Sequence, residues 1–255
     1  MSEVTKTQEK KAIKRERIQA KYRREKEEKK AKRASSELVE KNESEPSFIV
    51  DGIRAIRQER NAMFRADFEA KCDHGPVVVI DCEWGDKMTS KELLSLTQQI
   101  MYSYSTVKRS EKPVRLWIVG VSEEQATLLR NLPGLDTWNV VLTTQSLEQL
   151  NLAESAVYLT ADSADVIDVQ HIDANSTLII GGIVDRNRHK NCTLDKAKLL
   201  GMKTAQLPIG EFMPLKSSKV LTVNHVVHIL TEVLTHKSWK RALDTVIPDR
   251  KRGRE

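Results

Sequence analysis

The stretch LIIGGIVDRNRHK, residues 178–190, passes from an unbroken apolar run into a loop of charged residues. The apolar half is typical of a strand that is buried on both faces of a sheet. Gly181 and Gly182 near its end allow the backbone to come close to a ligand, although a bulge or tight packing against a helix explains them equally well. The stretch therefore predicts a central strand that leads into a ligand-binding edge.

Similar apolar runs recur on both sides of this stretch and alternate with segments of helical periodicity. The predicted strands are 77–82, 114–121, 138–142, 156–160, 177–184 and 204–207, and the predicted helices are 52–72, 90–107 (with Ser90 as N-cap), 123–131, 193–201, 221–234 and 238–245. This alternation predicts an α/β fold whose mostly parallel sheet is covered by helices on both faces. Ligands bind such sheets where loops leave the carboxyl ends of the strands, here after Leu159, Val184 and Leu207.

The composition favours an intracellular protein with a polyanionic partner. The 255-residue chain has 31% charged residues, a net charge of +6 and only 5% aromatic residues, and a basic balance of this kind favours nucleic acid. Cys72, Cys82 and Cys192 form no CxxC pair, which argues against a disulfide framework or a zinc cluster and indicates a reducing compartment. No apolar run is long enough to span a bilayer, so we expect no membrane partner.

The first 48 residues differ sharply from the rest. The segment KKAIKRERIQAKYRREKEEKKAKR, residues 10–33, is almost entirely charged and has too few apolar positions to form a core. We interpret residues 1–48 as a basic, partly disordered or helical arm with a linker, which binds RNA; a solubilising tail is the alternative. The candidate RNA-binding residues on this arm are Lys10, Lys11, Lys14, Arg15, Arg23 and Arg24.

Asp185 is the residue of the charged loop with the clearest chemical potential. It follows the apolar run directly and precedes several basic residues, which favour the ionised carboxylate. On spacing alone, a structural ion pair or a turn explains it better than a general base beside phosphate-binding cations. The chain has neither GxGxxG nor GxxxxGK[ST], so the usual device of a phosphate-cradling nucleotide site is missing. His225 and His228 share one helical face but have no evident third ligand, so we expect no metal.

Six segments in order resemble one family of enzymes. They are DCEW (81–84), VYLTADS (157–163), IIGGIVDRNRHK (179–190), AQLPIGEF (205–212), KVLTVNHVVHIL (219–230) and SWKRALDTVIPDRK (238–251). Together they resemble the SPOUT-class tRNA methyltransferases that modify N1 of the purine at position nine, in particular the eukaryotic guanine-9 type. The similarity runs from about residue 50 to residue 251, and a basic N-terminal arm is also typical of the eukaryotic members.

The resemblance implies a SPOUT methyltransferase domain at 76–250, with a helical lead-in at 49–75 and a basic tail at 251–255. In SPOUT domains the C-terminal part threads a loop into a trefoil knot, a feature that pattern reasoning alone argues against. The knot loops bind S-adenosyl-L-methionine, largely through backbone groups. Carried onto this sequence, the cofactor-binding residues are Leu159, Thr160, Gly182, Val184, Asp185, Arg186, Asn187, Arg188, Cys192, Leu207, Lys219, Val220, Leu221 and Thr222.

The activity that the resemblance implies is S-adenosylmethionine-dependent methylation of N1 of guanine at position 9 of tRNA. Neutral guanine carries a proton on N1, and Asp185 is the family's candidate general base for removing it. Because an aspartate is ordinarily a weak base, we expect much of the rate to come from positioning and from Asn187 and Arg188 near guanine O6. The remaining predicted RNA contacts are Arg186, Arg188, Lys190, Arg250 and Lys251.

Two alternatives to this function stay open. Adenine N1 at the same position needs no deprotonation and is a second possible target, and a non-catalytic tRNA-binding scaffold could keep the same fold. The missing phosphate loop argues against a third interpretation, a different nucleotide-binding enzyme on a doubly wound sheet. The resemblance further implies a monomer without a metal requirement, located in the nucleus, the cytoplasm or both.

Overall fold

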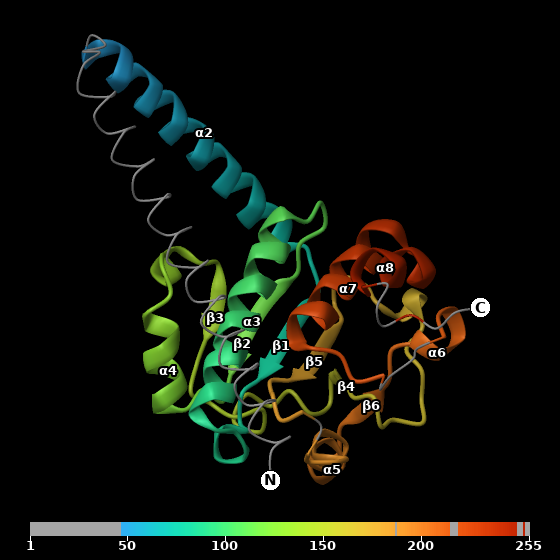
Figure 1. Ribbon diagram of the computed structural model, residues 1–255. Coiled ribbons are helices and arrows are strands. Elements are labelled where there is room, and N and C mark those ends of the chain that lie inside the picture. Colours follow the sequence, from blue (N-terminus) through green and yellow to red (C-terminus); the bar gives the residue numbers. More distant parts are fainter. Residues whose placement is uncertain (1–46, 187, 215–218, 249–251, 253–255) are drawn as a thin grey trace, which may run out of the picture. The chain divides into compact units, whose positions relative to one another are not determined.

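The computed structural model describes residues 47–186, 188–214, 219–248 and 252. The chain forms two compact units, residues 1–63 and residues 64–255. Helix α2 (Ser47–Asp73) supplies the described part of the first unit and continues into the second, and it includes most of the predicted lead-in. The other described helices and strands belong to the second unit (Figure 1). In the part of the chain that is described, no helix is both long and apolar enough to cross a membrane.

The second unit is built around a six-stranded parallel sheet in the order β3-β2-β1-β5-β4-β6. Its strands are β1 (Val77–Asp81), β2 (Arg115–Val119), β3 (Val140–Leu142), β4 (Ala156–Leu159), β5 (Thr177–Gly181) and β6 (Lys203–Ala205). Every neighbouring pair runs parallel, and each strand overlaps a predicted one. The predicted parallel α/β sheet is therefore confirmed.

Strands β1 and β5 occupy the centre of the sheet, which explains their unbroken apolar sequences. They pair residue for residue, so that Asp81 lies opposite Gly181. The backbone N–H of Gly182 then donates to the Asp81 carbonyl at 2.7 Å. This register joins the DCEW segment to the glycine pair, although the two are far apart in the sequence.

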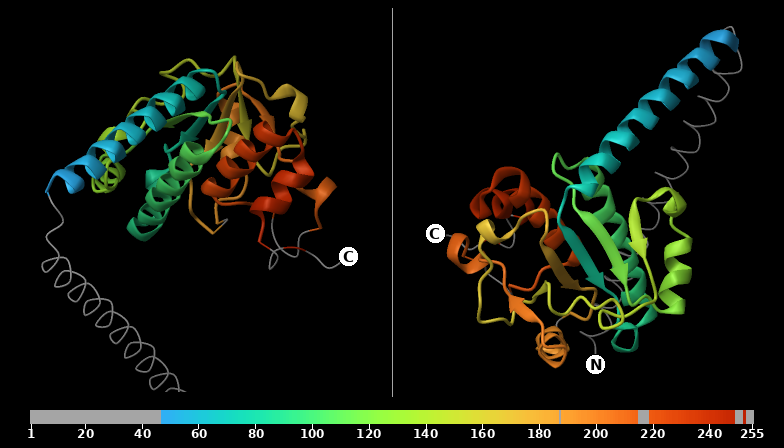
Figure 2. Two further views of the ribbon diagram at one scale, coloured as in Figure 1. Left: turned by 90° about the horizontal axis from the view of Figure 1, so that it is seen from above. Right: turned by 180° about the vertical axis from the view of Figure 1, so that it is seen from behind.

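Helices cover the two faces of this sheet unequally (Figure 2). The helices are α3 (Ser90–Arg109), α4 (Glu123–Arg130), α5 (Cys192–Leu199), α6 (Ile209–Phe212), α7 (Val223–His236) and α8 (Trp239–Val246). The larger core joins one face, including Ile80, to α3, α4, α7 and α8. The smaller core joins the other face, including Ile179, to Ala197 of α5 and to loop residues such as Leu147. Helical cover on the second face is thus much thinner than we predicted.

Several predicted boundaries are wrong, and tertiary contacts explain most of them. Strand β5 ends at Gly181 rather than at 184, because its partner β1 ends opposite it. Helix α7 begins at Val223 rather than at 221, since the preceding residues line a pocket. The N-cap of α3 is Thr89, not Ser90: Thr89 and Glu92 form a capping box, a signal that the sequence carried in the spacing T-x-x-E.

Candidate functional site

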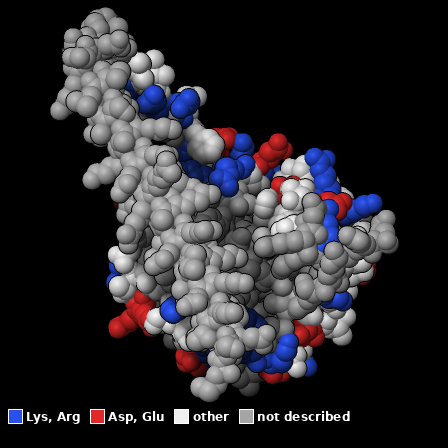
Figure 3. Space-filling view, viewed as in Figure 1, with Lys and Arg blue, Asp and Glu red and all other residues white. Residues whose placement is uncertain are grey.

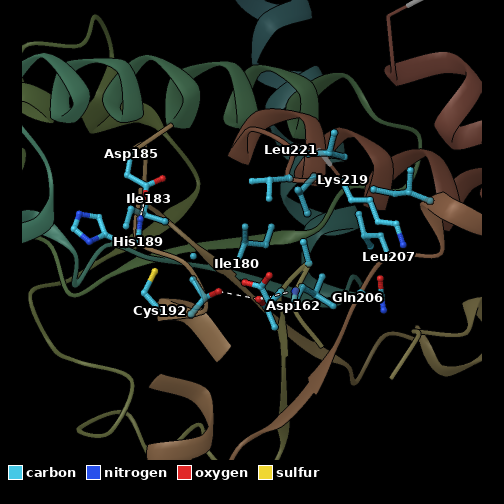
Figure 4. A pocket seen from close by; sticks show the side chains of 18 residues that line it. Asp162, Ile180, Ile183, Asp185, His189, Cys192, Gln206, Leu207, Lys219 and Leu221 are labelled. Atoms are coloured by element: carbon cyan, nitrogen blue, oxygen red, sulfur yellow. Dashed lines mark hydrogen bonds between the residues drawn. The ribbon is translucent and has the colours of Figure 1, made fainter. Parts of the chain in front are cut away.

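A pocket opens where the loops leave the carboxyl ends of β4, β5 and β6 (Figure 4). It encloses about 880 Å³ of empty space, including the part that is open to solvent. Its lining residues are Leu159, Thr160, Ala161, Asp162, Ile180, Gly181, Ile183, Asp185, His189, Cys192, Thr193, Gln206, Leu207, Ile209, Lys219, Val220, Leu221 and Val226. These residues lie at the ends of β4 and β5, in the loops that follow β4, β5 and β6, at the starts of α5 and α6, and in the segment that leads into α7 together with its first turn.

The pocket has two chemically different ends (Figure 4). Asp185, His189 and Cys192 gather at one end, whereas Leu207 and Lys219 lie at the other. Ile180 lies between them. A ligand that fills the pocket therefore meets a carboxylate at one end and an apolar, lysine-bearing wall at the other.

The glycine pair lies where there is no room for a side chain. A Cβ atom on Gly181 would lie 2.6 Å from Thr193 Cγ2, and one on Gly182 would lie 2.7 Å from the Asp81 carbonyl oxygen. Gly181 lines the pocket, while Gly182 is packed against β1. Tight packing therefore explains Gly182, and Gly181 serves both packing and the pocket wall.

Asp185 is nearly buried, with 8% of its surface exposed. Its Oδ2 accepts a hydrogen bond from the backbone N–H of His189 at 2.7 Å, and its carbonyl accepts one from the backbone N–H of Arg188 at 3.2 Å. Arg186 next to it adopts a left-handed backbone conformation with φ of 53° and is exposed. The loop thus holds its one carboxylate inward, at the pocket wall, while Arg186 is exposed to solvent.

The structure brings together only part of the residues predicted to bind the cofactor. Those that line the pocket are Leu159, Thr160, Asp185, Cys192, Leu207, Lys219, Val220 and Leu221. Those that do not are Gly182, Val184, Arg186, Arg188 and Thr222, and Asn187 lies outside the described residues. Val184 instead donates its N–H to Met88 Sδ at 3.3 Å, and Thr222 is the N-cap of α7.

The predicted RNA-binding residues are only partly visible in the structure. Arg186, Arg188 and Lys190 are exposed on the loop after β5. Lys10, Lys11, Lys14, Arg15, Arg23, Arg24, Arg250 and Lys251 lie outside the described residues. The described Lys and Arg side chains that are visible in Figure 3 lie in several places beside Asp and Glu side chains.

Sequence reasoning predicted Thr160 but missed Thr193, Gln206 and Asp162 as polar residues of the pocket. The hydroxyls of Thr160 and Thr193 form a hydrogen bond at 2.8 Å, which joins the β4 loop to α5 across the pocket floor. Gln206 Nε2 donates to the Ser163 carbonyl at 2.7 Å and braces the loop that carries Asp162. Asp162 lies within the quoted VYLTADS segment, so the motif pointed at this residue although its place in the pocket needed the fold.

A buried charged network lies directly behind the pocket. The Asp81 carboxylate is fully buried and accepts hydrogen bonds from Lys196 Nζ at 2.9 and 2.8 Å and from the Tyr158 hydroxyl at 2.7 Å. Lys196 also pairs with Glu83 at 2.7 Å and lies 4.9 Å from the centre of the Trp84 ring. Burial, and then the Asp81 charge, raise the pKa of Tyr158 well above its ordinary value. Tyr158 therefore remains a neutral hydrogen-bond donor.

Cys192 is a protonated thiol at neutral pH. Partial burial raises its pKa, and the nearby charge of Asp185 adds to the effect. The thiolate, not the thiol, is the nucleophilic form. Cys192 therefore lines the pocket and is not a candidate nucleophile.

His228, one of the two helical histidines, has an ordinary partner on its own helix. His228 Nε2 lies 3.7 Å from Glu232 on the next turn of α7, and burial lowers the pKa of His228. Among the described residues, no group of His, Cys, Asp and Glu has an arrangement that could hold a metal ion.

The fold and the site define a class of proteins. The chain is similar to the crystal structure of full-length spTrm10 in complex with SAH, with a TM-score of 0.63 and 36% identity, over 69% of this chain and 95% of that one. A dual-specific Trm10 from Thermococcus kodakaraensis has a TM-score of 0.53 at 20% identity and supports the fold alone. The protein therefore has the α/β SPOUT fold of these enzymes.

The family follows from the sequence comparisons. The family model described as tRNA (guanine(9)-N(1))-methyltransferase TRM10/TRM10A matches residues 2–252, and the chain belongs to this family. The tRNA (guanine(9)-N1)-methyltransferase of Kluyveromyces lactis is 35% identical over 70% of this chain and 60% of its own length. The tRNA methyltransferase 10 homolog A of Rattus norvegicus is 35% identical over 68% of this chain and 52% of its own length. The chain thus spans little more than half the length of these relatives.

Proposed function

We propose that this protein methylates N1 of guanine at position 9 of tRNA with S-adenosyl-L-methionine as methyl donor. The observation that carries the proposal is Asp185, held at one end of a pocket that the loops after β4, β5 and β6 build together. Membership in the TRM10/TRM10A family supports the substrate and the position, since the relatives bear that activity in their names. The SAH complex of spTrm10 supports the cofactor.

The residues of the pocket fit such a cofactor. Adenine and ribose need an apolar cleft with hydrogen-bonding groups at its edge, and Leu207, Ile209 and Leu221 supply apolar surface near Lys219 and Gln206. Gly181 lines the wall of the pocket, and its missing side chain lets Thr193 pack closely against it. Bound here, S-adenosylmethionine supplies the electrophilic methyl group.

The chain's own residues have to orient the base and remove its proton. We propose that the Asp185 carboxylate removes the proton from guanine N1. A hydrogen bond from the His189 N–H holds this carboxylate in one orientation. Since an aspartate is an ordinary weak base, fixing N1 in line with the methyl group supplies much of the rate. Asn187 remains our candidate for the developing negative charge on guanine O6.

The test of this role is the variant Asp185→Asn in the full chain. We expect its single-turnover methylation rate on a guanine-9 tRNA to fall at least about tenfold, because an amide cannot accept the proton. Its dissociation constants for tRNA and for S-adenosylmethionine should stay close to those of the wild type. Asp195→Asn, an exposed carboxylate on α5, is the matched control.

Three results would contradict the proposal at different levels. Identical pH–rate profiles for the wild type and Asp185→Asn would exclude the base role. Methylation of adenine-9 tRNA with no methylation of guanine-9 tRNA, measured by mass spectrometry of the nucleoside at position nine, would give the alternative target. Absence of S-adenosylmethionine binding in isothermal titration would favour a non-catalytic tRNA-binding scaffold.

The same family membership supports further proposals about the molecule. We propose a trefoil knot in the C-terminal part of residues 76–250, a monomeric protein without a metal requirement, and a location in the nucleus, the cytoplasm or both. The basic arm at 1–48 and the tail at 251–255 are proposed to hold tRNA, with Arg186 and Lys190 near the pocket. Unchanged activity after treatment with a metal chelator, and a monomer mass in light scattering, are the expected results.

A further inference from the structure

One guanidinium connects the loop that carries Asp185 to two other segments of the chain. Arg188 Nε donates to the Asp185 carbonyl at 3.0 Å. Its Nη2 donates to the Lys87 carbonyl at 3.3 Å and to Glu92 Oε2 at 2.7 Å. Lys87 ends the short 3₁₀ helix η1 (Gly85–Lys87), and Glu92 lies in the first turn of α3. The side chain thus spans three elements, although 49% of its surface is exposed.

Glu92 is fixed independently of Arg188, which makes it an anchor. Its Oε2 accepts the backbone N–H of Thr89 at 2.9 Å, which is one of the two bonds of the α3 capping box, and it also accepts the Thr89 hydroxyl at 3.0 Å. The pKa of Glu92 lies below its ordinary value, mainly because of the Thr89 backbone N–H, and Arg188 contributes. An ion pair whose acceptor is already immobilised loses less side-chain entropy than an ordinary surface pair.

A second contact joins the same loop to the same corner of the fold. The N–H of Val184, just before Asp185, donates to Met88 Sδ at 3.3 Å. The loop is therefore attached to the segment 87–92 on both sides of Asp185. Neither attachment uses the Asp185 carboxylate itself, which remains directed at the pocket wall with the His189 N–H on its Oδ2.

We propose that Arg188 is a positioning residue, whose guanidinium fixes the Asp185 loop against the first turn of α3 through Glu92 and does not bind the base or the tRNA backbone. The inference rests on the proposed function, since it concerns the placement of the proposed base. It replaces the expectation that Arg188 acts at guanine O6. Displacement of a reacting group by about 1 Å is enough to lower a rate by two orders of magnitude, so a tether of this kind has kinetic consequences.

The test is a set of double-mutant cycles in the full chain, with single-turnover methylation of guanine-9 tRNA as readout. Arg188→Lys keeps the positive charge but loses the planar guanidinium, whose several N–H donors reach three acceptors. Glu92→Gln keeps an acceptor for the Thr89 N–H but loses the ion pair. We expect each variant to lower the rate about tenfold, with dissociation constants for tRNA and S-adenosylmethionine within about twofold of the wild type.

The coupling energies from these cycles distinguish a positioning role of Arg188 from direct contact with the RNA. The double variant Arg188→Lys, Glu92→Gln should be no slower than the slower single variant, because both changes disrupt the same ion pair. Asp185→Asn should lower the rate by a smaller factor in the Arg188→Lys background than in the wild type, which a merely structural loss would not produce. Arg65→Lys is the matched control, since Arg65 pairs with Glu69 at 2.9 Å on the exposed surface of α2, and we expect no change in rate.

Other outcomes would overturn the proposal. Losses that multiply in the double variant, or weaker tRNA binding with a smaller salt dependence in Arg188→Lys, would assign Arg188 to the RNA. Full activity of Arg188→Lys would show that the tether has no role. If thermal unfolding shows that Glu92→Gln does not fold, the Arg188–Asp185 cycle alone decides. If the wild type methylates no purine at position 9, both the proposed function and this inference are wrong. If the wild type is active, the variants test the role of Arg188 alone.

Discussion

At the scale of single residues, the fully buried Asp81 depends on its partners. A carboxylate without water is tolerated in a protein interior only when it is paired and hydrogen-bonded. Lys196 supplies the charge and Tyr158 a hydroxyl, and Gly182 binds the carbonyl of the same residue. The pocket wall is therefore built on an ionic contact between β1 and α5.

Replacing Lys196 by Met should destabilise the protein strongly. The change leaves the Asp81 charge buried without its cation, and we expect the free energy of unfolding to fall by about 3 kcal/mol. Urea unfolding followed by circular dichroism measures it. Lys198→Met, an exposed position on the same helix, should change the value by less than about 0.5 kcal/mol. A loss no larger for Lys196→Met than for Lys198→Met would refute the argument.

The buried Cys72 thiol makes the stability of the folded protein fall at alkaline pH. Burial, with smaller contributions from Asp73 and Glu69, raises its pKa from 9.0 to about 12. Between these values the unfolded chain has released the thiol proton and the folded protein still holds it, so stability falls as the pH rises above 9. The fall amounts to at most about 1.4 kcal/mol per pH unit.

The variant Cys72→Ala removes this titration. It should be less stable at pH 7, since it leaves a small cavity, but its stability should decline less steeply between pH 9 and 10.5. Cys82, which is also buried, is present in both proteins and cancels in the comparison. Parallel stability curves over that range would show that Cys72 does not titrate differently in the two states.

At the scale of elements, helix α3 organises the entrance to α7. The N-cap residue of α7, Thr222, makes no side-chain capping bond. Gln99 of α3 takes this role instead: its Oε1 accepts the backbone N–H of Val223 at 3.0 Å, in a buried position. Because residues 219–221 line the pocket just before this point, the cap also fixes part of the pocket wall.

We expect Gln99→Leu to affect both stability and the pocket. Loss of the acceptor leaves the Val223 N–H buried without a partner and should lower the free energy of unfolding by about 1–3 kcal/mol. Isothermal titration should also show weaker binding of the proposed cofactor, S-adenosylmethionine. Gln98→Leu, exposed on the same helix, is the control. Unchanged affinity in a destabilised Gln99→Leu would confine the role of Gln99 to the helix.

At the scale of the whole molecule, charge is distributed unevenly along the chain. The chain has a net charge of +6, and its segment 10–33 is strongly basic. The described charged side chains that are visible in Figure 3 include both signs. We expect glutamate at Lys10, Lys11, Lys14, Arg15, Arg23 and Arg24 to weaken tRNA binding and reduce its salt dependence, with S-adenosylmethionine affinity unchanged. Filter binding across a salt series measures this. An unaltered salt slope would favour the solubilising-tail interpretation.

The sequence by itself determined the parallel α/β sheet and the edge at which the pocket lies. Buried central strands need continuous apolar runs, and 77–81 and 177–181 show them. The spacing T-x-x-E also carries the capping box of Thr89 and Glu92, because capping is a local interaction. The ordered set of short segments identified the family, since their order is preserved along the chain.

Only the tertiary structure decided which of the loop residues face the pocket. Arg188 follows Asp185 by three positions, yet Glu92 draws its guanidinium to α3, while Asp185 stays at the pocket wall. Asp162, Gln206 and Thr193 joined the pocket for the same reason. Side-chain direction in an irregular loop is set by partners far along the chain, and neither periodicity nor spacing carries that information. The stretch LIIGGIVDRNRHK thus fixed the place of the site, and the contacts around it fixed the separate positions of its residues.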